Sequence, residues 1–169
     1  MDIFVLRHGR AGSWNPLRYP DDRLRPLTSE GQDRLGRQVL VMKAIEVCPE
    51  VIVSSPLTRA LQTAQIVHRG LDSPRPLATS DALTPGADPY DTLEELATDY
   101  ASFASVMIVG HEPHLSGFTS VAVAGSHEPI IRIRKGALCK ISLQPSAYGH
   151  TGRIEWCLTA GQMLRLARQ

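Results

Sequence analysis

Three short apolar runs occur along the chain, and each ends abruptly in polar residues. The runs are IFVL at 3–6, VIV at 51–53 and VMIV at 106–109. Apolar runs of this length without polar alternation are typical of strands buried on both faces of a parallel sheet. The pattern therefore predicts strands at 2–6, 50–55 and 105–110. Further strands are expected near 76–79, at 130–134 with 137–143, and at 153–158.

Between the strands, apolar residues recur at the spacing of an amphipathic helix. The first such set predicts a helix over about 30–46, and its members are Leu35, Val39, Met42 and Ile45. Ser29 is followed three residues later by Gln32, which is a capping-box pattern. The sequence therefore predicts Ser29 as the N-cap of this helix.

Capping residues and prolines mark the later helices. One helix is expected after Ser55 as its N-cap, with Gly70 beyond its C-terminus. The next begins behind Asp88 as its N-cap. A loop that runs into a helix is expected within 111–125, and a short helix at 160–168 closes the chain.

Strands that alternate with helices predict an α/β fold. We expect three layers, α/β/α, with a mostly parallel sheet covered on both faces. The length of 169 residues, without repeats or a linker, indicates one domain over residues 1–169. A net charge of +1 gives no overall attraction to nucleic acid or to a membrane surface. No signal-peptide core and no apolar stretch of about 20 residues is present, so no membrane partner is expected.

The cysteines bear on the cellular compartment. Cys48, Cys139 and Cys157 are odd in number and widely spaced, without a CxxC pair. This arrangement argues against a disulfide framework or a zinc site and favours a reducing cytoplasm. We expect a cytoplasmic protein in which all three cysteines are core thiols.

The residues that follow the three apolar runs share one chemistry. Arg7 and His8 follow the first run, Arg59 lies one turn into the helix after the second, and His111 follows the third. Ligands of open α/β sheets bind outside the carboxyl ends of the strands, so these side chains should converge. Arginine binds phosphate oxygens through a planar, always-charged fork, and a helix N-terminus adds free N–H groups. The sequence predicts a site for a tetrahedral phosphate dianion.

Other phosphate chemistries lack support in the sequence. The acidic cluster that Mg²⁺ or Mn²⁺ would need is missing, and so is a GxxxxGK[ST] loop. Neither a metal nor a cofactor is indicated. A neutral histidine can instead attack phosphorus through one ring nitrogen while the other donates its proton to a carbonyl. The second histidine can donate a hydrogen bond to the phosphoryl oxygens.

Three segments carry a family resemblance. LRHGRA at 6–11, SSPLTRALQTA at 54–64 and VGHEP at 109–113 resemble the signature segments of the histidine phosphatase superfamily, with its phosphoglycerate mutase-like fold. The short chain, RPLTSEG at 25–31 and the absence of a cap insertion resemble its SixA-type phosphohistidine phosphatases. The resemblance implies that His8 is the phosphorylated nucleophile. It implies that Arg7, Arg59 and His111 bind the phosphate, with Arg25 nearby.

The general acid is less clear from the sequence. Larger members of the superfamily place a catalytic Glu or Asp after the LTP-type region. The candidates here are Asp81 and Asp88, neither in a clear glutamate motif, and Asp88 is also an expected helix cap. A weak acid favours a substrate with a good leaving group, such as a phosphoramidate.

Two basic features are open to more than one interpretation. Arg10 stands where relatives often carry an acidic residue, so it either favours acidic partners or is simply solvated. IRIRK at 131–135 alternates basic and apolar residues, which is typical of a strand with one wet face.

The sequence as a whole predicts an enzyme, a metal-independent phosphatase that acts through a phosphohistidine intermediate. The expected partner is a phosphorylated protein that carries phosphohistidine on a helical domain. One alternative is a small-molecule phosphomonoesterase that uses Asp81 or Asp88 as its general acid. Another, from a different class, is a phospho-ligand binding or regulatory module that does not hydrolyse its ligand.

Overall fold

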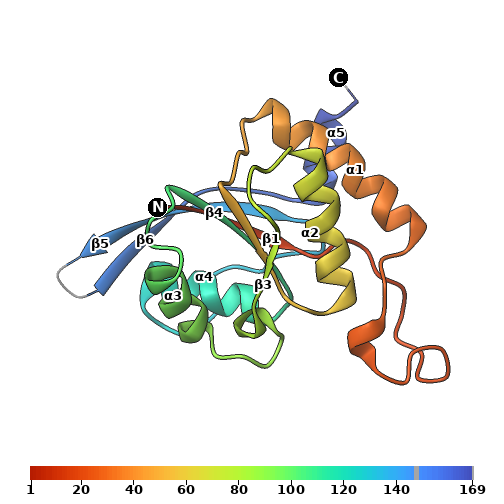
Figure 1. The fold of residues 1–169 in the computed structure, drawn as a ribbon, viewed down its shortest axis with the longest axis horizontal. Helices are drawn as coiled ribbons and strands as arrows, with labels where there is room; N and C mark the ends of the chain where they lie inside the picture. The colour runs from red at the N-terminus through yellow and green to blue at the C-terminus, as the bar shows by residue number, and fades with distance from the viewer. Residues whose placement is uncertain (147–148, 169) are drawn as a thin grey trace.

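One mixed sheet of six strands organises the computed structural model, which describes residues 1–146 and 149–168 (Figure 1). The strand order is β3-β2-β4-β1-β5-β6. The strands are β1 Asp2–Arg7, β2 Val51–Ser54, β3 Ala78–Thr79, β4 Ser105–Gly110, β5 Leu138–Ser146 and β6 Gly149–Leu158. The first four strands pair in parallel, whereas β5 and β6 pair antiparallel to their neighbours.

Helices cover both faces of this sheet. They are α1 Ser29–Ala44, α2 Thr58–Gly70, α3 Pro89–Thr98, α4 His114–Ala124 and α5 Ala160–Leu166. Helices α1, α2 and α5 lie on one face, and α3 and α4 lie on the other (Figure 1). Alternate residues of β1 enter the two cores, since Val5 packs with Phe118 while Leu6 packs with Leu35. The predicted three-layer α/β fold is confirmed.

Two predicted helix caps are wrong. The N-cap of α1 is Thr28, whose side chain accepts a hydrogen bond from the Gly31 N–H at 3.0 Å. Helix α2 begins only at Thr58, behind Leu57 without a side-chain cap, and Gly70 is its last residue. Ser55 does not cap α2, and its hydroxyl lies 2.9 Å from Nε2 of His111 instead. Asp88 does cap α3, as predicted.

The segment 130–134 is not a strand. Its backbone bonds to side chains instead of a neighbouring strand, because the Ile133 N–H donates to Glu112 Oε1 at 2.9 Å. The Ile133 carbonyl accepts from Arg7 Nη1 at 2.9 Å. The alternation in IRIRK therefore reflects a loop held by two charged side chains.

The cysteine prediction is also wrong. Cys139 and Cys157 stand opposite each other on β5 and β6 and form a disulfide. A separation of 18 residues does not reveal this pairing, because it depends on the register of two adjacent strands. Cys48 follows α1 and is exposed. None of the described helices is long and apolar enough to cross a membrane.

Candidate active site

The carboxyl ends of β1, β2 and β4 meet because β4 pairs in parallel with both other strands. The His8 N–H donates to the Gly110 carbonyl at 3.1 Å, and the Ser55 N–H donates to the Val109 carbonyl at 2.9 Å. These bonds extend the ladder past the strand ends. The rings of His8 and His111 consequently lie with their centroids 5.0 Å apart.

His8 is held in one tautomer. Its side chain is buried, and Nδ1 lies 2.7 Å from the carbonyl oxygen of Gly9. A carbonyl only accepts hydrogen bonds, so Nδ1 carries the hydrogen and Nε2 keeps its lone pair. Burial lowers the pKa of His8 to about 3, and the charges of Arg59 and Arg7 act in the same direction. The ring is therefore neutral near pH 7.

His111 bonds to the protein through Nε2 instead. Its Nε2 lies 2.9 Å from Ser55 Oγ, and that oxygen already accepts from the Leu57 N–H at 3.4 Å. The Ser55 oxygen still has a lone pair and a hydrogen, so its hydrogen bond with Nε2 can run in either direction. The oxygens of an anion only accept, so the form of His111 that binds an anion has the Ser55 hydroxyl donating to Nε2 and the ring hydrogen on Nδ1. Burial, followed by the proximity of His8, lowers the pKa of His111 to about 2. This histidine is also neutral and offers a donor.

Two arginines border the histidines. Arg7 reaches Ile133 through Nη1, and Arg59 donates from Nη1 to the carbonyl of Asp22 at 2.8 Å. Burial lowers the pKa of both guanidiniums. The Nε of each arginine and Nδ1 of His111 are buried without a partner in the described part of the chain. Buried N–H groups need acceptors, and the oxygens of a tetrahedral anion can supply them.

Asp22 is a site residue that the sequence did not reveal. Its carboxylate contacts Arg59 Nη2 at 3.1 Å and Arg25 Nε at 2.7 Å. The hydrogen bond from Arg25 is the main cause that lowers the pKa of Asp22. Arg25 also donates to the Gly12 carbonyl at 2.6 Å. Arg25 therefore joins the site through Asp22, inside a loop that has no periodic pattern.

Lys135 is a second residue that sequence reasoning missed. Burial and the charges of Arg7, Arg25 and Arg59 lower its pKa, so its ammonium lies within the field of the arginines. Its presence in a run of basic residues was the only available signal.

The two candidate acids form no direct bond with this cluster. Asp81 is exposed at the start of the turn Asp81–Leu83, and Asp88 is exposed at the cap of α3, where it accepts from the Tyr90 N–H. No hydrogen bond or ion pair within residues 1–146 and 149–168 joins either carboxylate to Arg7, His8, Arg59 or His111. Those same ranges also contain no group of three His, Cys, Asp or Glu side chains that could hold a metal ion.

Comparison of the sequence with known proteins finds similarity to histidine phosphatases. The model of the histidine phosphatase superfamily (branch 1) matches residues 3–84. The phosphohistidine phosphatase SixA of Escherichia coli K12 is 29% identical over 150 residues, which are 88% of this chain and 89% of that protein.

Solved structures agree with this assignment. A structure of the protein histidine phosphatase SixA complexed with tungstate superposes with a TM-score of 0.83 and 26% identity, covering 95% of this chain and 98% of that one. A mycobacterial glucosyl-3-phosphoglycerate phosphatase has a TM-score of 0.67 at 14% identity, covering 92% and 97% of the two chains, which shows the fold alone. The chain has the phosphoglycerate mutase-like fold, and in sequence and structure it is similar to the histidine phosphatase superfamily, as a phosphatase that resembles SixA.

Proposed function

We propose that this phosphatase transfers the phosphoryl group of its substrate to Nε2 of His8, and that the substrate is phosphohistidine on a protein. The observation that carries the proposal is the bond from His8 Nδ1 to the Gly9 carbonyl at 2.7 Å. It leaves Nε2 as a neutral nucleophile beside two arginines. Binding of a phospho-ligand alone would not require a histidine fixed in this way.

The proposed reaction has two steps. Nε2 of His8 attacks phosphorus, the P–N bond of the substrate breaks, and the leaving imidazole nitrogen takes the electron pair and a proton from water. Water then attacks the phosphorus of phospho-His8, and inorganic phosphate leaves as the P–Nε2 bond breaks. Arg7, Arg59 and His111 donate hydrogen bonds to the phosphoryl oxygens in both steps.

The position of the carboxylates supports a phosphoramidate substrate. An alkoxide needs a proton from a positioned acid as it leaves, whereas an imidazole needs much less help. Within the described residues, Asp81 and Asp88 form no hydrogen bond or ion pair with the four residues that surround the phosphoryl site. Glu112 is occupied by the Ile133 N–H and by the hydroxyl of Ser116. The name of the E. coli relative agrees with this substrate class.

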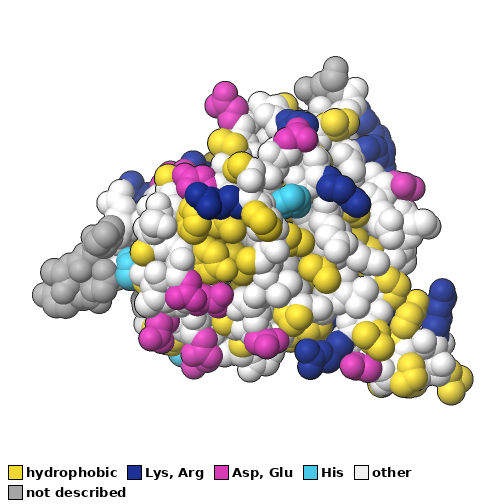
Figure 2. All heavy atoms as spheres, in the orientation of Figure 1, with side chains coloured by type: hydrophobic (Ala, Val, Ile, Leu, Met, Phe, Trp, Pro, Cys, Tyr) yellow, Lys and Arg dark blue, Asp and Glu magenta, His cyan; other side chains and the backbone are white. Residues whose placement is uncertain are grey.

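The loop between β1 and α1 supports a macromolecular substrate. It projects from the body of the molecule and exposes Trp14, Leu17 and Leu24, and apolar side chains gather at that end of the surface (Figures 1 and 2). Leu17 is 94% exposed. Large apolar side chains grouped on a projecting surface are typical of protein contacts. The same loop carries Asp22, so a docked protein lies beside the arginines.

The test uses two substrates in the presence of EDTA. A phosphohistidine peptide and p-nitrophenyl phosphate are incubated with the wild type, with His8→Ala, and with His127→Ala as a control at an exposed histidine. We expect phosphate release from the peptide, an acid-labile phosphoenzyme in the wild type and in His127→Ala, and neither in His8→Ala. Full activity of His8→Ala would refute the mechanism. Hydrolysis of the ester alone would replace phosphohistidine by a small phosphomonoester as the substrate.

A further inference from the structure

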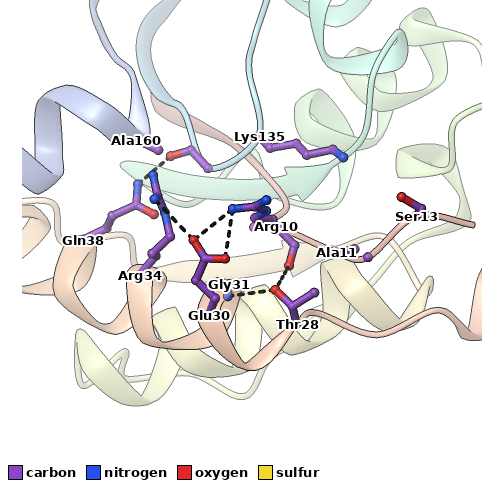
Figure 3. Close-up of a pocket in the computed structure, with 13 residues that line it drawn as sticks. Arg10, Ala11, Ser13, Thr28, Glu30, Gly31, Arg34, Gln38, Lys135 and Ala160 are labelled. Carbon is purple, nitrogen blue, oxygen red and sulfur yellow. Dashed lines mark hydrogen bonds and ion pairs between the residues drawn. The ribbon is translucent and has the colours of Figure 1, made fainter.

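A hollow of about 620 Å³ opens beside the phosphoryl site, and it is here called the basic groove (Figure 3). One wall is the segment from Gly9 to Ser13, which directly follows His8. Helix α1 forms a second wall, and Lys135 and Gly136 lie across the hollow from it (Figure 3). The side chains that give it charge are Arg10, Arg34, Lys135 and Glu30.

Cations outnumber carboxylates in the basic groove. Arg10 Nη1 lies 2.9 Å from both carboxylate oxygens of Glu30, and Arg34 Nη1 lies 3.7 Å from one of them (Figure 3). One carboxylate is thus shared by two guanidiniums. Lys135 forms no ion pair in the described part of the chain, and burial together with the charges of nearby arginines lowers its pKa. Three cations against one carboxylate leave an excess of two positive charges.

The lysine side of the basic groove is fastened to the strand that carries the nucleophile. The Gly136 N–H lies 3.1 Å from the carbonyls of both Arg7 and His8, and its own carbonyl accepts from Gln38 Nε2 at 2.8 Å. Gly136 has a φ of +70°, and a Cβ there would meet Gln38 Oε1 at 3.1 Å. Lys135 therefore has a defined position relative to His8.

The side of the groove that carries Arg10 is also held by backbone contacts close to His8. The Arg10 carbonyl accepts from the Thr28 N–H at 3.0 Å, and a Cβ on Gly31 would overlap that carbonyl. Close backbone contact of this kind requires glycine. Both walls are thus set by backbone contacts next to His8, so a ligand in the basic groove has a fixed distance from the phosphoryl group.

We infer that the basic groove binds the carboxylate of an Asp or Glu side chain adjacent to the phosphohistidine of the protein substrate. The inference rests on the proposed function, because one substrate must occupy both sites. Glu30 already occupies this wall as a carboxylate between two arginines, which indicates the chemistry that the groove accepts. A substrate carboxylate pairs with Lys135 and with the N–H groups of Arg10 that face away from Glu30. The consequence is selection for acidic sequence beside the phosphorylated residue.

The test compares two phosphohistidine peptides of equal length. One carries Glu on both sides of the phosphohistidine, and the other carries Gln at the same positions. In the wild type we expect kcat/KM to be about five- to tenfold higher for the acidic peptide, the size of one or two partly exposed ion pairs. Added salt should lower that preference, because exposed charges are screened.

Two variants and one control test whether the preference for the acidic peptide comes from the basic groove. Lys135→Gln and Arg10→Gln should each bring the acidic-to-neutral ratio of kcat/KM toward one. Arg37→Gln is the matched control, since Arg37 is exposed on α1 and lines a different hollow together with Leu40. It should leave the ratio unchanged.

The outcomes separate this inference from the proposed function. Equal kcat/KM for the two peptides in the wild type overturns the inference, and so does an equal loss on both peptides in Lys135→Gln and Arg10→Gln. In either case, phosphate release that still requires His8 leaves the proposed function standing. If the wild type releases phosphate from neither peptide, the proposed function fails and the inference fails with it.

Discussion

The end of β1 and the end of β4 carry the same residue type in similar surroundings, but they present it differently. His8 and His111 are 4% and 2% exposed, and both have a strongly lowered pKa. His8 gives its Nδ1 hydrogen to the carbonyl of the next residue, whereas Nε2 of His111 faces the Ser55 hydroxyl at 2.9 Å and its Nδ1 has no partner within the described residues. With an anion bound, one ring therefore presents a lone pair and the other an N–H.

This difference shows how a fold assigns roles to identical side chains. Burial alone makes both rings neutral, because the charged form loses its hydration. The tautomer then depends on the partner of the ring nitrogen that bonds to the protein. A carbonyl requires a hydrogen on that nitrogen, whereas a hydroxyl can donate its own hydrogen to it. A nucleophile and a hydrogen-bond donor can thus be built from two histidines with their rings 5.0 Å apart.

The largest expected effect comes from removing the lone pair at the end of β1. We expect His8→Ala to lower kcat on a phosphohistidine peptide by at least about 10⁴-fold, because the variant lacks the nucleophile of the proposed reaction. Single-turnover experiments with a radiolabelled peptide should show no phosphoenzyme. A phosphoenzyme that persists in His8→Ala would place the nucleophile elsewhere.

Removing the hydrogen-bond donor at the end of β4 should lower kcat less than removing the nucleophile does. We expect His111→Ala to lower kcat by about 10²–10³-fold, the usual loss for one hydrogen-bond donor to a developing oxyanion. The phosphoenzyme should still form, only more slowly. The measurement is the rate of phosphoenzyme formation after rapid mixing. A His111→Ala variant that forms no phosphoenzyme at all would make the two histidines equivalent and contradict the comparison.

Changing the partner of His111 should have a smaller effect. Ser55→Ala removes the hydroxyl that fixes the tautomer, and we expect a loss of about tenfold in kcat, equivalent to one hydrogen bond. The ring nitrogen shifts of His111 in NMR spectra should show a mixture of tautomers. Ser54→Ala is the matched control, since the neighbouring Ser54 hydroxyl donates to a backbone carbonyl and not to the histidine. An equal loss in both variants would mean that Ser55 acts only through packing.

The sequence predicted much of this arrangement because strand ends can be read locally. Arg7 and His8 directly follow an apolar run, and the carbonyl of Gly9 is the next acceptor along the chain. The partners that come from distant segments could not be predicted. The Ser55–His111 bond spans 56 residues, and Asp22 reaches Arg59 from an irregular loop.

The errors in the fold have the same physical cause. Residues 130–134 alternate like a strand, but their backbone bonds go to Glu112 and Arg7, which no periodicity reports. The disulfide between Cys139 and Cys157 depends on strand register, which is set by pairing across the whole hairpin. Ser55 resembles a helix cap in sequence, yet its hydroxyl is used by the histidine. Local sequence patterns thus predict most helices and strands, whereas side-chain bonds between distant segments are not visible in them.

The two strand ends should also make the free energy of unfolding depend on pH. In the unfolded chain a histidine titrates near pH 6.5, whereas the folded pKa of His8 is about 3 and that of His111 is about 2. The unfolded state therefore binds more protons as the pH falls below 6.5, so stability is complete above that pH and is lost on acidification. Each ring contributes a slope of up to about 1.4 kcal/mol per pH unit between 6.5 and 3. The measurement is the free energy of unfolding in urea at several pH values from 7.5 to 5. Its dependence on pH should be weaker in His8→Asn and in His111→Asn than in the wild type, and unchanged in His127→Asn.

The smallest effect is expected from the carboxylates outside the two strand ends. If the two histidines and their arginines are sufficient, Asp81→Asn and Asp88→Asn should change kcat on a phosphohistidine peptide by less than about twofold, because imidazole leaves with little help. Asn is as good an N-cap as Asp, so Asp88→Asn should keep α3 and its hydrogen bond to the Tyr90 N–H. An alkyl phosphate sharpens the test, since its leaving group needs an acid. A tenfold loss on that ester in one variant, with the peptide rate unchanged, would identify the carboxylate as a general acid that reaches the site only with substrate bound.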